Sequence, residues 1–436
     1  MKKSASLKLI IFSFLLVAGS VAYSAPVIGP GTAIDSTVAG VDNEASKAYS
    51  SAFGNQNKAS GEISSAFGNQ NKASGVYSSA FGFDNKATEN YSSAFGNQNE
   101  ASGKNSSAFG FNNAATGISS SAFGLSNTAT GMNSSAVGFN NTATGVNSSA
   151  IGYQNETSGV ISSAFGFRNK ASGMNSSAIG YQNEASGDNS STVGLYNKAS
   201  AKNSSAFGTV NTASGINSST VGTLNTASAK NSSAFGTQYK VTGEASGAFG
   251  VGKATWNNTT KVFDYDYINE GKNSYMFGNY NKIAAGTENN FILGNNVSIG
   301  SGINNSVGLG NGSTVSSSNE VSVGSATLKR KITNVADGDV SATSTDAVNG
   351  RQLYKAMQNS NENLRNEVNE KIDDVKDEVN HIGSLSAALA GLHPMQYDPK
   401  APTQVMAALG NYKNKQSVAV GLSYYFNDRF MMSAGV

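Results

Sequence analysis

The chain has 436 residues, of which 49 are glycine and 5 are proline, and it contains no cysteine. Charged residues make up 13% and the net charge is only +2, which excludes bulk electrostatic attraction to nucleic acid or to a membrane surface. Disulfides and thiolate metal sites are excluded as well, and the composition indicates a polar repeat array more than two or three globular domains.

The N-terminus has the features of an export signal. Three lysines within the first eight residues precede an apolar run from Leu9 to Val17, and small residues follow at Ala22 and Ser24. This order is typical of a secretory signal peptide with its cleavage site. We therefore expect residues 1–24 to be removed and the exported chain to begin at Ala25.

A 14-residue repeat fills most of the chain. Its glycines recur from Gly54 to Gly250 without a change of step, and the unit reads Asn-Ser-Ser-Ala-(Phe/Ile/Val)-Gly-x-x-Asn-x-Ala-(Ser/Thr)-Gly. A unit this short cannot fold alone, so successive units must stack. Fourteen residues leave room for two strands of about five residues and two tight turns, which predicts one coil of a flattened β-roll. We expect Asn57 and Gly61 to supply positive φ angles at the turns.

Stacking aligns equivalent residues in columns along the roll. Phe53 then lies over Phe67, about 4.8 Å away, and the asparagines from Asn57 to Asn225 form an amide ladder. Each unit supplies only one large apolar residue and two alanines, too little to enclose a core in a thin monomer. Self-association is the expected remedy.

A column of lysines is the first candidate binding surface. Lys58, Lys72 and Lys86 occupy the same position in successive repeats, so three ammonium groups stack about 4.8 Å apart. Such a column suits a sulfated glycan or another anionic partner. The alternative is a solvated face that only maintains solubility.

A column of aromatic residues is the second candidate. Phe139, Tyr153, Phe167 and Tyr181 each follow the repeat glycine directly. If the strand continues through that glycine, the rings share the packed face of the repeat and belong to the core. If the chain turns there, they form an exposed aromatic strip.

The third candidate is an irregular insertion at about residues 251–277, rich in aromatic residues. It contains Trp256, Phe263, Tyr265, Tyr267 and Tyr275. Either it is a protruding loop with an aromatic binding face, or its rings fill irregular coils, since aromatic residues are more often buried. Degenerate repeats resume at Phe277-Gly278, Leu293-Gly294, Val307-Gly308 and Val323-Gly324.

The composition changes at Ser325, and a helical pattern follows. The segment 346–353 precedes a charged run whose apolar residues are four, four, three, four and three residues apart: Leu364, Val368, Ile372, Val375, Val379 and Ile382. This spacing is typical of a coiled coil, and β-branched seam residues favour three strands.

The last segment alternates with a period of two. Large apolar residues occupy one face, and small residues occupy the other at Ala419, Gly421, Ser423 and Gly435. This pattern is typical of transmembrane β-barrel strands, with strands expected at 404–412 and 417–426 and a third from Phe430.

Taken together, these segments resemble the trimeric autotransporter adhesins, the YadA-like family. The resemblance rests on the Ser-Ala-(Phe/Ile/Val)-Gly repeats, the 346–353 segment, the coiled coil, and Leu385 to Leu392 before the final strands. It implies a mainly β fold: a left-handed parallel β-roll head at 25–325, a neck at 326–356, a trimeric coiled-coil stalk at 357–384 and a membrane anchor at 385–436.

The same resemblance implies a homotrimer anchored in the outer membrane by a barrel of four strands from each chain. A complete anchor would need a further strand beyond Val436, so we expect this anchor to be incomplete. The family's barrel is inserted by the cell's barrel-assembly machinery and exports the head to the cell surface. The collagen-binding relative has Val and Ile around the repeat alanine, where this chain has Ser51 and Phe53, so collagen specificity does not carry over.

The implied function is adhesion to host extracellular matrix proteins, glycans or cell-surface receptors, without cofactor or nucleic acid. The alternative is a structural fibre that joins bacterial cells in autoaggregation and biofilm. Catalysis is not expected, because Lys170 separates Glu156 from Glu184 and neither His381 nor His393 has an identifiable nucleophile partner. No catalytic or metal site is therefore predicted.

Overall fold

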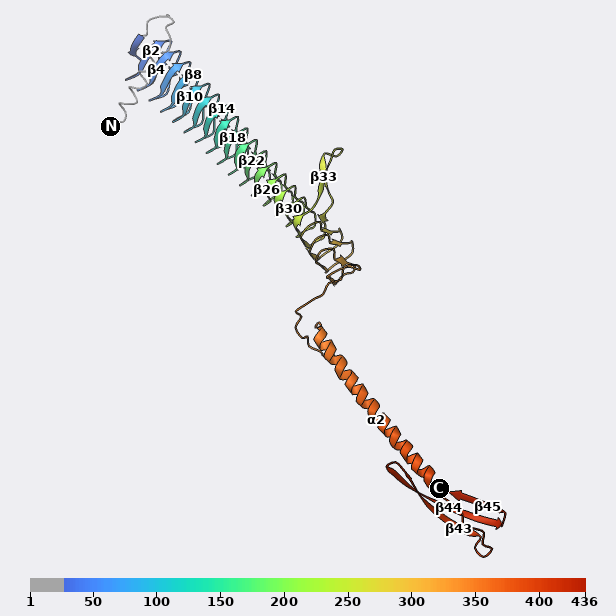
Figure 1. Ribbon diagram of the computed structural model, residues 1–436. Coiled ribbons are helices and arrows are strands. Elements are labelled where there is room, and N and C mark those ends of the chain that lie inside the picture. The colour runs from blue at the N-terminus through green and yellow to red at the C-terminus, as the bar shows by residue number, and fades with distance from the viewer. Residues whose placement is uncertain (1–26) are drawn as a thin grey trace. The chain divides into compact units, whose positions relative to one another are not determined.

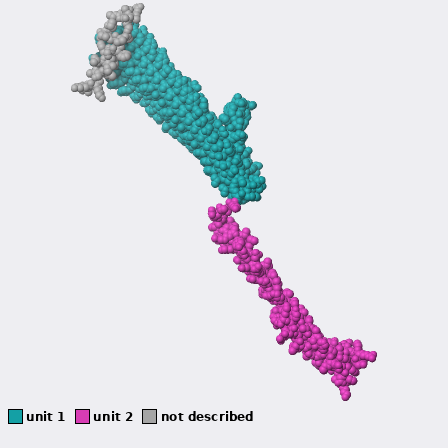
Figure 2. Space-filling model, viewed as in Figure 1, with its two compact units in different colours: residues 1–330 teal, residues 331–436 magenta. Residues whose placement is uncertain are grey.

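The computed structural model describes residues 27–436, so the signal peptide expected at 1–24 lies outside the described part of the chain. The chain divides into two compact units, one up to Arg330 and one from Lys331 onward (Figure 2). Among the described residues, no helix combines the length and the hydropathy that crossing a bilayer requires.

The first unit is a parallel β-solenoid of about 20 turns (Figure 1). Each regular coil gives one five-residue strand to a first sheet and one two-residue strand to a second. Equivalent residues pair throughout, as in Ser51 with Ser65 and Lys58 with Lys72. The expectation of two strands of about five residues is therefore wrong for the second strand, because a longer connection from residue 60 to 64 turns the chain back.

The strands of the regular coils repeat at a step of 14 residues. The long strands are β2 (Thr37–Val41), β4 (Ser51–Asn55), β6 (Ser65–Asn69), β8 (Ser79–Phe83), β10 (Ser93–Asn97), β12 (Ser107–Phe111), β14 (Ser121–Leu125), β16 (Ser135–Phe139), β18 (Ser149–Tyr153), β20 (Ser163–Phe167), β22 (Ser177–Tyr181), β24 (Ser191–Leu195), β26 (Ser205–Thr209), β28 (Ser219–Thr223), β30 (Ser233–Thr237) and β32 (Gly247–Val251). The short strands are β3 (Glu44–Ala45), β5 (Lys58–Ala59), β7 (Lys72–Ala73), β9 (Lys86–Ala87), β11 (Glu100–Ala101), β13 (Ala114–Ala115), β15 (Thr128–Ala129), β17 (Thr142–Ala143), β19 (Glu156–Thr157), β21 (Lys170–Ala171), β23 (Glu184–Ala185), β25 (Lys198–Ala199), β27 (Thr212–Ala213), β29 (Thr226–Ala227) and β31 (Lys240–Val241). Strand β1 (Val27–Pro30) pairs antiparallel with β2 at the start of the stack.

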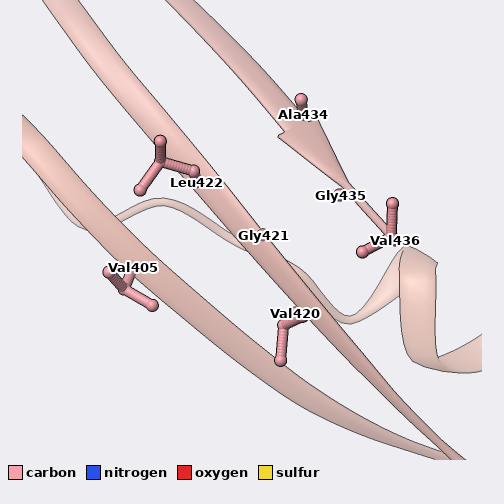
Figure 3. Close-up of a pocket in the computed structure, with 7 residues that line it drawn as sticks. All are labelled: Val405, Val420, Gly421, Leu422, Ala434, Gly435 and Val436. Atoms are coloured by element: carbon pink, nitrogen blue, oxygen red, sulfur yellow. The ribbon is translucent and has the colours of Figure 1, made fainter.

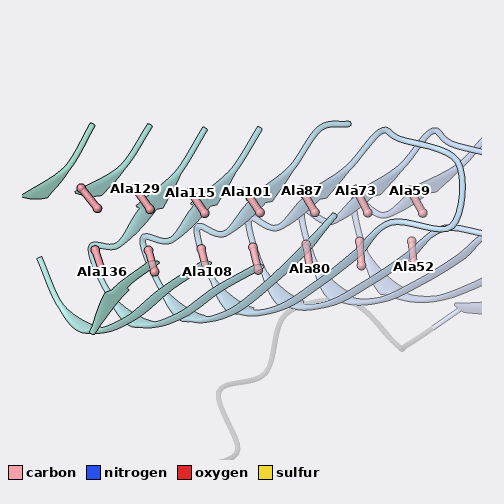
Figure 4. Close-up of a cluster of buried hydrophobic side chains, with 14 of the residues drawn as sticks. Ala52, Ala59, Ala73, Ala80, Ala87, Ala101, Ala108, Ala115, Ala129 and Ala136 are labelled. Carbon is pink, nitrogen blue, oxygen red and sulfur yellow. The ribbon is translucent and has the colours of Figure 1, made fainter. Parts of the chain in front are cut away.

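The interior of the solenoid is made of alanine. Ala52 and its equivalents on the long strands face Ala59 and its equivalents on the short strands, and both columns are fully buried (Figure 4). Because a methyl group is small, the two sheets approach closely and no large side chain fits between them. The large apolar residue of each repeat, such as Phe53, therefore projects outward and is only half-buried.

A buried amide ladder runs beside the alanines. The Asn99 side chain donates to the carbonyls of Phe95 and Gly110, at 2.9 and 2.7 Å. Its oxygen accepts from the backbone and side-chain nitrogens of Asn113, at 3.1 and 2.9 Å. The same bonds recur in successive coils, which satisfies polar groups that the narrow interior would otherwise leave unpaired.

The turns use other residues than expected. Positive φ angles occur at Gly54 (115°), Gln56 (55°) and Ile63 (54°), and not at Asn57 or Gly61. Asn57 contributes through its side chain, which is part of the amide ladder. Gly61 is needed for close approach, since a Cβ there would collide with the carbonyl of Gly75.

The insertion is a β-hairpin extruded between two coils. Strand β32 pairs directly with β36 (Tyr275–Phe277) although their equivalent residues are 28 apart in sequence. One repeat of 14 residues therefore completes the coil, and the remaining 14 form the hairpin of β33 (Ala254–Asn257) and β34 (Val262–Tyr265). The hairpin stands out from the solenoid surface (Figures 1 and 2).

The last coils have a larger apolar interior and a different register. Their strands are β35 (Ile268–Asn269), β37 (Lys282–Ile283), β38 (Phe291–Leu293), β39 (Ser298–Ile299), β40 (Val307–Leu309), β41 (Thr314–Val315) and β42 (Val321–Ser322). Ile292 pairs with Gly308, so Gly294 aligns with Gly310. The sequence pattern aligned Gly308 with Gly294, and this alignment is wrong by two residues. Gly308 instead occupies an interior position where Val297 and Val315 fill the space.

The second unit begins with an extended segment and a single long helix, α2 (Gly350–Ala390). Asn349 caps the helix by accepting from the backbone nitrogen of Gln352, whose side chain accepts in return from the Asn349 backbone. Arg351 pairs with Asp337 at 2.7 Å and lowers the pKa of that carboxyl. The apolar positions expected as a coiled-coil seam, from Leu364 to Ile382, are all exposed on the single chain.

The end of α2 packs against a sheet of β43 (Thr403–Tyr412), β44 (Lys415–Asn427) and β45 (Phe430–Gly435). Ser384 and Ser417 share a hydrogen bond of 2.5 Å, and Ala419 is fully buried. Large residues such as Leu409 and Val418 point away from the helix and are exposed. Figure 3 shows a shallow apolar hollow among the three strands, lined by Val405, Val420, Gly421, Leu422, Ala434, Gly435 and Val436.

Candidate ligand-binding surfaces

The lysine column lies on the outer side of the short strands. Lys58, Lys72 and Lys86 are paired in register and exposed. Glu44 and Glu100 precede and follow them in the same column, and Lys58 forms an ion pair of 2.8 Å with Glu44. Three lysines and two glutamates leave a net charge of +1 over five coils. The column is therefore a weaker anionic-ligand site than three lysines alone would make.

Further along, this column alternates in charge. Lys170 pairs with Glu156 at 3.2 Å and Lys198 pairs with Glu184 at 3.0 Å. The carboxylates are neutralised by exposed lysines one coil away. The geometry is that of a surface ion-pair ladder, which contributes little to stability per pair.

The aromatic column lies outside the coil. Phe139, Tyr153, Phe167 and Tyr181 stack with ring centroids 4.8 to 4.9 Å apart, and Phe139 and Tyr181 are each 37% exposed. The strand does continue through the repeat glycine, so the rings share the outward face of Val137 and Ile151. They are not core residues of this chain, because the interior is occupied by alanine.

A second outward stack lies in earlier coils, at the position before the repeat glycine. Phe53, Phe67, Phe81, Phe95 and Phe109 follow one another with centroids 4.7 to 4.8 Å apart and nearly parallel planes. Offset and stacked rings of this kind add to the stability of the column. The two stacks together give the long strands an apolar outer face.

The insertion splits its aromatic residues between two places. Trp256 lies on the hairpin, is 46% exposed and packs edge-on against Phe263 at 5.0 Å. Tyr265 reaches back to the solenoid, where its hydroxyl donates to the carbonyl of Leu224 at 3.0 Å and lies 3.0 Å from the Thr226 hydroxyl. Burial raises the pKa of Tyr265. Tyr267 is part of the solenoid and packs against its larger apolar interior.

Tyr239 is a structural position at the base of the hairpin that the sequence did not lead us to expect. It replaces the asparagine of the amide ladder at the coil from which the hairpin leaves, and it is fully buried. Its hydroxyl donates to the carbonyl of Gly278 at 2.7 Å and accepts from the Asn281 backbone at 3.2 Å. Burial raises the pKa of Tyr239 to about 12. The signal was available, because the asparagine column ends at Asn225.

An exposed apolar strip was also missed. It follows one turn of five successive coils and consists of Ile118, Met132, Val146, Val160 and Met174. Four of these are exposed and Val146 is half-buried. The variable residue after the second repeat glycine becomes apolar in these coils, which was the signal for a contact surface.

The chain matches three family models along its length. A YadA head domain repeat matches in ten segments, some of them overlapping, between residues 32 and 238. The coiled stalk of trimeric autotransporter adhesins matches residues 331–375, and a YadA-like membrane anchor domain matches residues 395–436.

Two known proteins are similar to parts of the chain. Autotransporter adhesin BtaE of Brucella suis biovar 1 (strain 1330) is 68% identical over 34 residues, which are 8% of this chain and 5% of that relative. The collagen-binding domain of the Yersinia adhesin YadA aligns over 48% of this chain and 86% of its own, with 21% identity and a TM-score of 0.25.

Proposed function

Because the chain belongs to the YadA-like trimeric autotransporter adhesins, we propose that it forms a homotrimer that exports and anchors its own head and binds host extracellular matrix or cell surfaces. Membership of this family implies an anchor in the outer membrane, display at the cell surface and a role in adhesion without catalysis.

One observation carries the proposal. The solenoid repeats each outward position once per coil, with aromatic centroids about 4.8 Å apart in the outer stacks. A partner with its own repeating structure can then contact many equivalent positions at once, so weak contacts add to a strong attachment. The lysine column from Lys58 to Lys86, the aromatic column from Phe139 to Tyr181 and the hairpin with Trp256 remain the candidate contact surfaces.

Self-association is the second candidate function, and the apolar strip from Ile118 to Met174 favours it. Exposed apolar residues in five successive coils make a continuous surface of the kind that joins proteins. Two heads that align such strips would hold neighbouring cells together. No host ligand is then required.

A comparison of adherence with clumping tests both candidates. Bacterial cells that display the full chain are expected to attach to surfaces coated with laminin, fibronectin or glycosaminoglycan at least tenfold more than cells without it. Self-association would be favoured over host adhesion if two results are found together. Cells that display the chain attach no better than cells without it, and their clumping is abolished by Met132→Ser with Met174→Ser. Cells that neither attach nor clump would contradict the proposed function.

A further inference from the structure

The hairpin forms one wall of a cleft on the solenoid surface. Trp256, Phe263 and Tyr265 line one side together with Lys261 and Val262 of the same hairpin. Three successive coils supply the floor through Val210, Thr212, Thr226 and Lys240. The cleft encloses about 500 Å³, which lies within the range of about 300 to 1,000 Å³ typical of small-ligand sites.

The base of the hairpin is fixed, so the cleft is formed before any ligand arrives. Tyr265 is tied to Leu224 and Thr226 by the contacts described above. Lys253 pairs with Asp266 at 3.3 Å across the two ends of the hairpin. A preformed site loses less conformational entropy on binding than a flexible loop does.

The floor differs from the two coils just before it in a way that makes room. At the position of Glu184 and Lys198, the next two coils carry Thr212 and Thr226. These shorter side chains leave the space that the cleft occupies. The long side chain returns at Lys240, at the end of the cleft nearest the hairpin's coil.

Val210 adds backbone strain to the same floor. Its φ angle is 55°, a left-handed conformation that is a genuine outlier for a β-branched residue. The equivalent residues in neighbouring coils, Gln182, Tyr196 and Leu224, adopt similar angles of 50° to 55°. The geometry of the repeat therefore imposes this conformation, and the valine side chain gives the cleft an apolar floor.

The charges of the cleft are unbalanced. Lys240 and Lys261 both line it, and neither forms an ion pair within residues 27–436. Two ammonium groups beside an indole and a phenyl ring, with threonine hydroxyls below, present both an anion site and an apolar surface. A neutral apolar ligand would leave both lysines without a partner.

We infer that this cleft binds an acidic sugar residue of a glycan chain. The apolar face of the pyranose ring would pack against Trp256, and its carboxylate or sulfate would contact Lys240 and Lys261. The inference rests on the proposed adhesin function and names a ligand class for one of its surfaces. One cleft per chain gives three in a homotrimer, so a polymeric glycan can bind several at once.

The fluorescence of Trp256 provides a direct test, because it is the only tryptophan in the chain. The full chain in detergent is titrated with a heparin tetrasaccharide, which carries sulfate as well as carboxylate, and with unsulfated chondroitin tetrasaccharide, which carries carboxylate only. A saturable change with at least one of them is expected, and tighter binding of the heparin tetrasaccharide would show that sulfate contributes. Cellotetraose, which is neutral, should produce no change.

Two double variants complete the test. Lys240→Gln with Lys261→Gln should raise the Kd at least tenfold, while Lys104→Gln with Lys202→Gln, which removes the same charge from exposed turns, should leave the Kd within twofold. Any of three results would overturn the inference. They are the absence of a fluorescence change with both acidic tetrasaccharides, binding of cellotetraose with equal affinity, and an equal loss of affinity in both double variants. If the tetrasaccharides do not bind the cleft but cells that display the chain still attach, the cleft inference fails and the adhesin function stands. If cells that display the unmodified chain do not attach at all, the adhesin function itself is contradicted.

Discussion

At the scale of single residues, the buried amide ladder holds one coil to the next. Each asparagine joins three coils through its side chain, as Asn99 does with Asn85, Gly110 and Asn113. Removing one amide therefore leaves backbone carbonyls and a neighbouring amide unpaired, and each buried unpaired group costs about 1–3 kcal/mol.

Asn99→Ala and Asn97→Ala make a matched pair that tests this. Asn99 is buried and makes five hydrogen bonds, whereas the Asn97 side chain lies outward on β10, where other coils carry Phe, Leu or Thr. We expect Asn99→Ala to lower the free energy of unfolding by on the order of 3 kcal/mol and Asn97→Ala by less than about 0.5 kcal/mol. Denaturant titration measures both, and equal effects would contradict the role of the ladder.

Tyr239 gives the fold a dependence on alkaline pH. Its pKa is raised to about 12 in the folded chain, above the ordinary value of about 10, so the folded state holds this proton more tightly. The contribution of this group to the free energy of unfolding is fully present below pH 10 and is lost as the pH rises through 12. Tyr239→Phe should be less stable at pH 7, because Gly278 and Asn281 lose a partner, and should lose less on going from pH 9 to pH 11. Thermal unfolding at these pH values measures the difference, and parallel declines would exclude Tyr239 as the source.

At the scale of elements, α2 presents an apolar seam with no partner on the single chain. Val368 and Ile372 are each 46% exposed. Ser substitutions at both positions should dissociate the oligomer or weaken it at least tenfold, since the seam loses most of its apolar area there. Ser substitutions at Glu367 and Lys371, which form an ion pair one position away, should leave the assembly intact. Sedimentation velocity distinguishes the two, and intact assembly in both variants would contradict the seam.

Neutralising the lysines of the column and neutralising its glutamates should shift heparin binding in opposite directions. Lys58→Gln with Lys72→Gln and Lys86→Gln should lower the salt concentration at which the chain elutes from heparin, because exposed charges act through screened attraction. Glu44→Gln with Glu100→Gln should raise it, since these carboxylates offset the lysines. Unchanged elution of both variants would remove the column as a binding surface.

Much of the element structure could be predicted from the sequence, because stacking forces equivalent residues into columns. The 14-residue step of the glycines and the asparagine column required a coil and an amide ladder. The sequence could not tell which face of the long strand points inward, since both alanine and phenylalanine are apolar. The aromatic column was therefore open between core and surface, and the alanine interior decides it.

The hairpin was harder to predict for a different reason. A gap of two repeats is compatible with two irregular coils or with one coil and an extruded segment. Only the direct pairing of β32 with β36 distinguishes them. The cleft depends on Val210 and Thr212, which are far from Trp256 in sequence and look like ordinary repeat variation.

At the scale of the whole molecule, one physical feature recurs in the solenoid and the helix. Each buries little apolar area on its own and exposes its large apolar residues in rows: the phenylalanine and aromatic columns of the head, and the seam of α2. Rows of this kind are stable in water when copies of the chain cover them. The proposed assembly of three chains would cover these rows.

The mass of the purified full chain in detergent tests this most directly. Native mass spectrometry is expected to give three copies of the chain at micromolar concentration, with the β and helical signals of the folded chain retained in circular dichroism. A stable, fully folded species containing one copy would contradict the central claim that the solenoid and the helix are completed by partner chains.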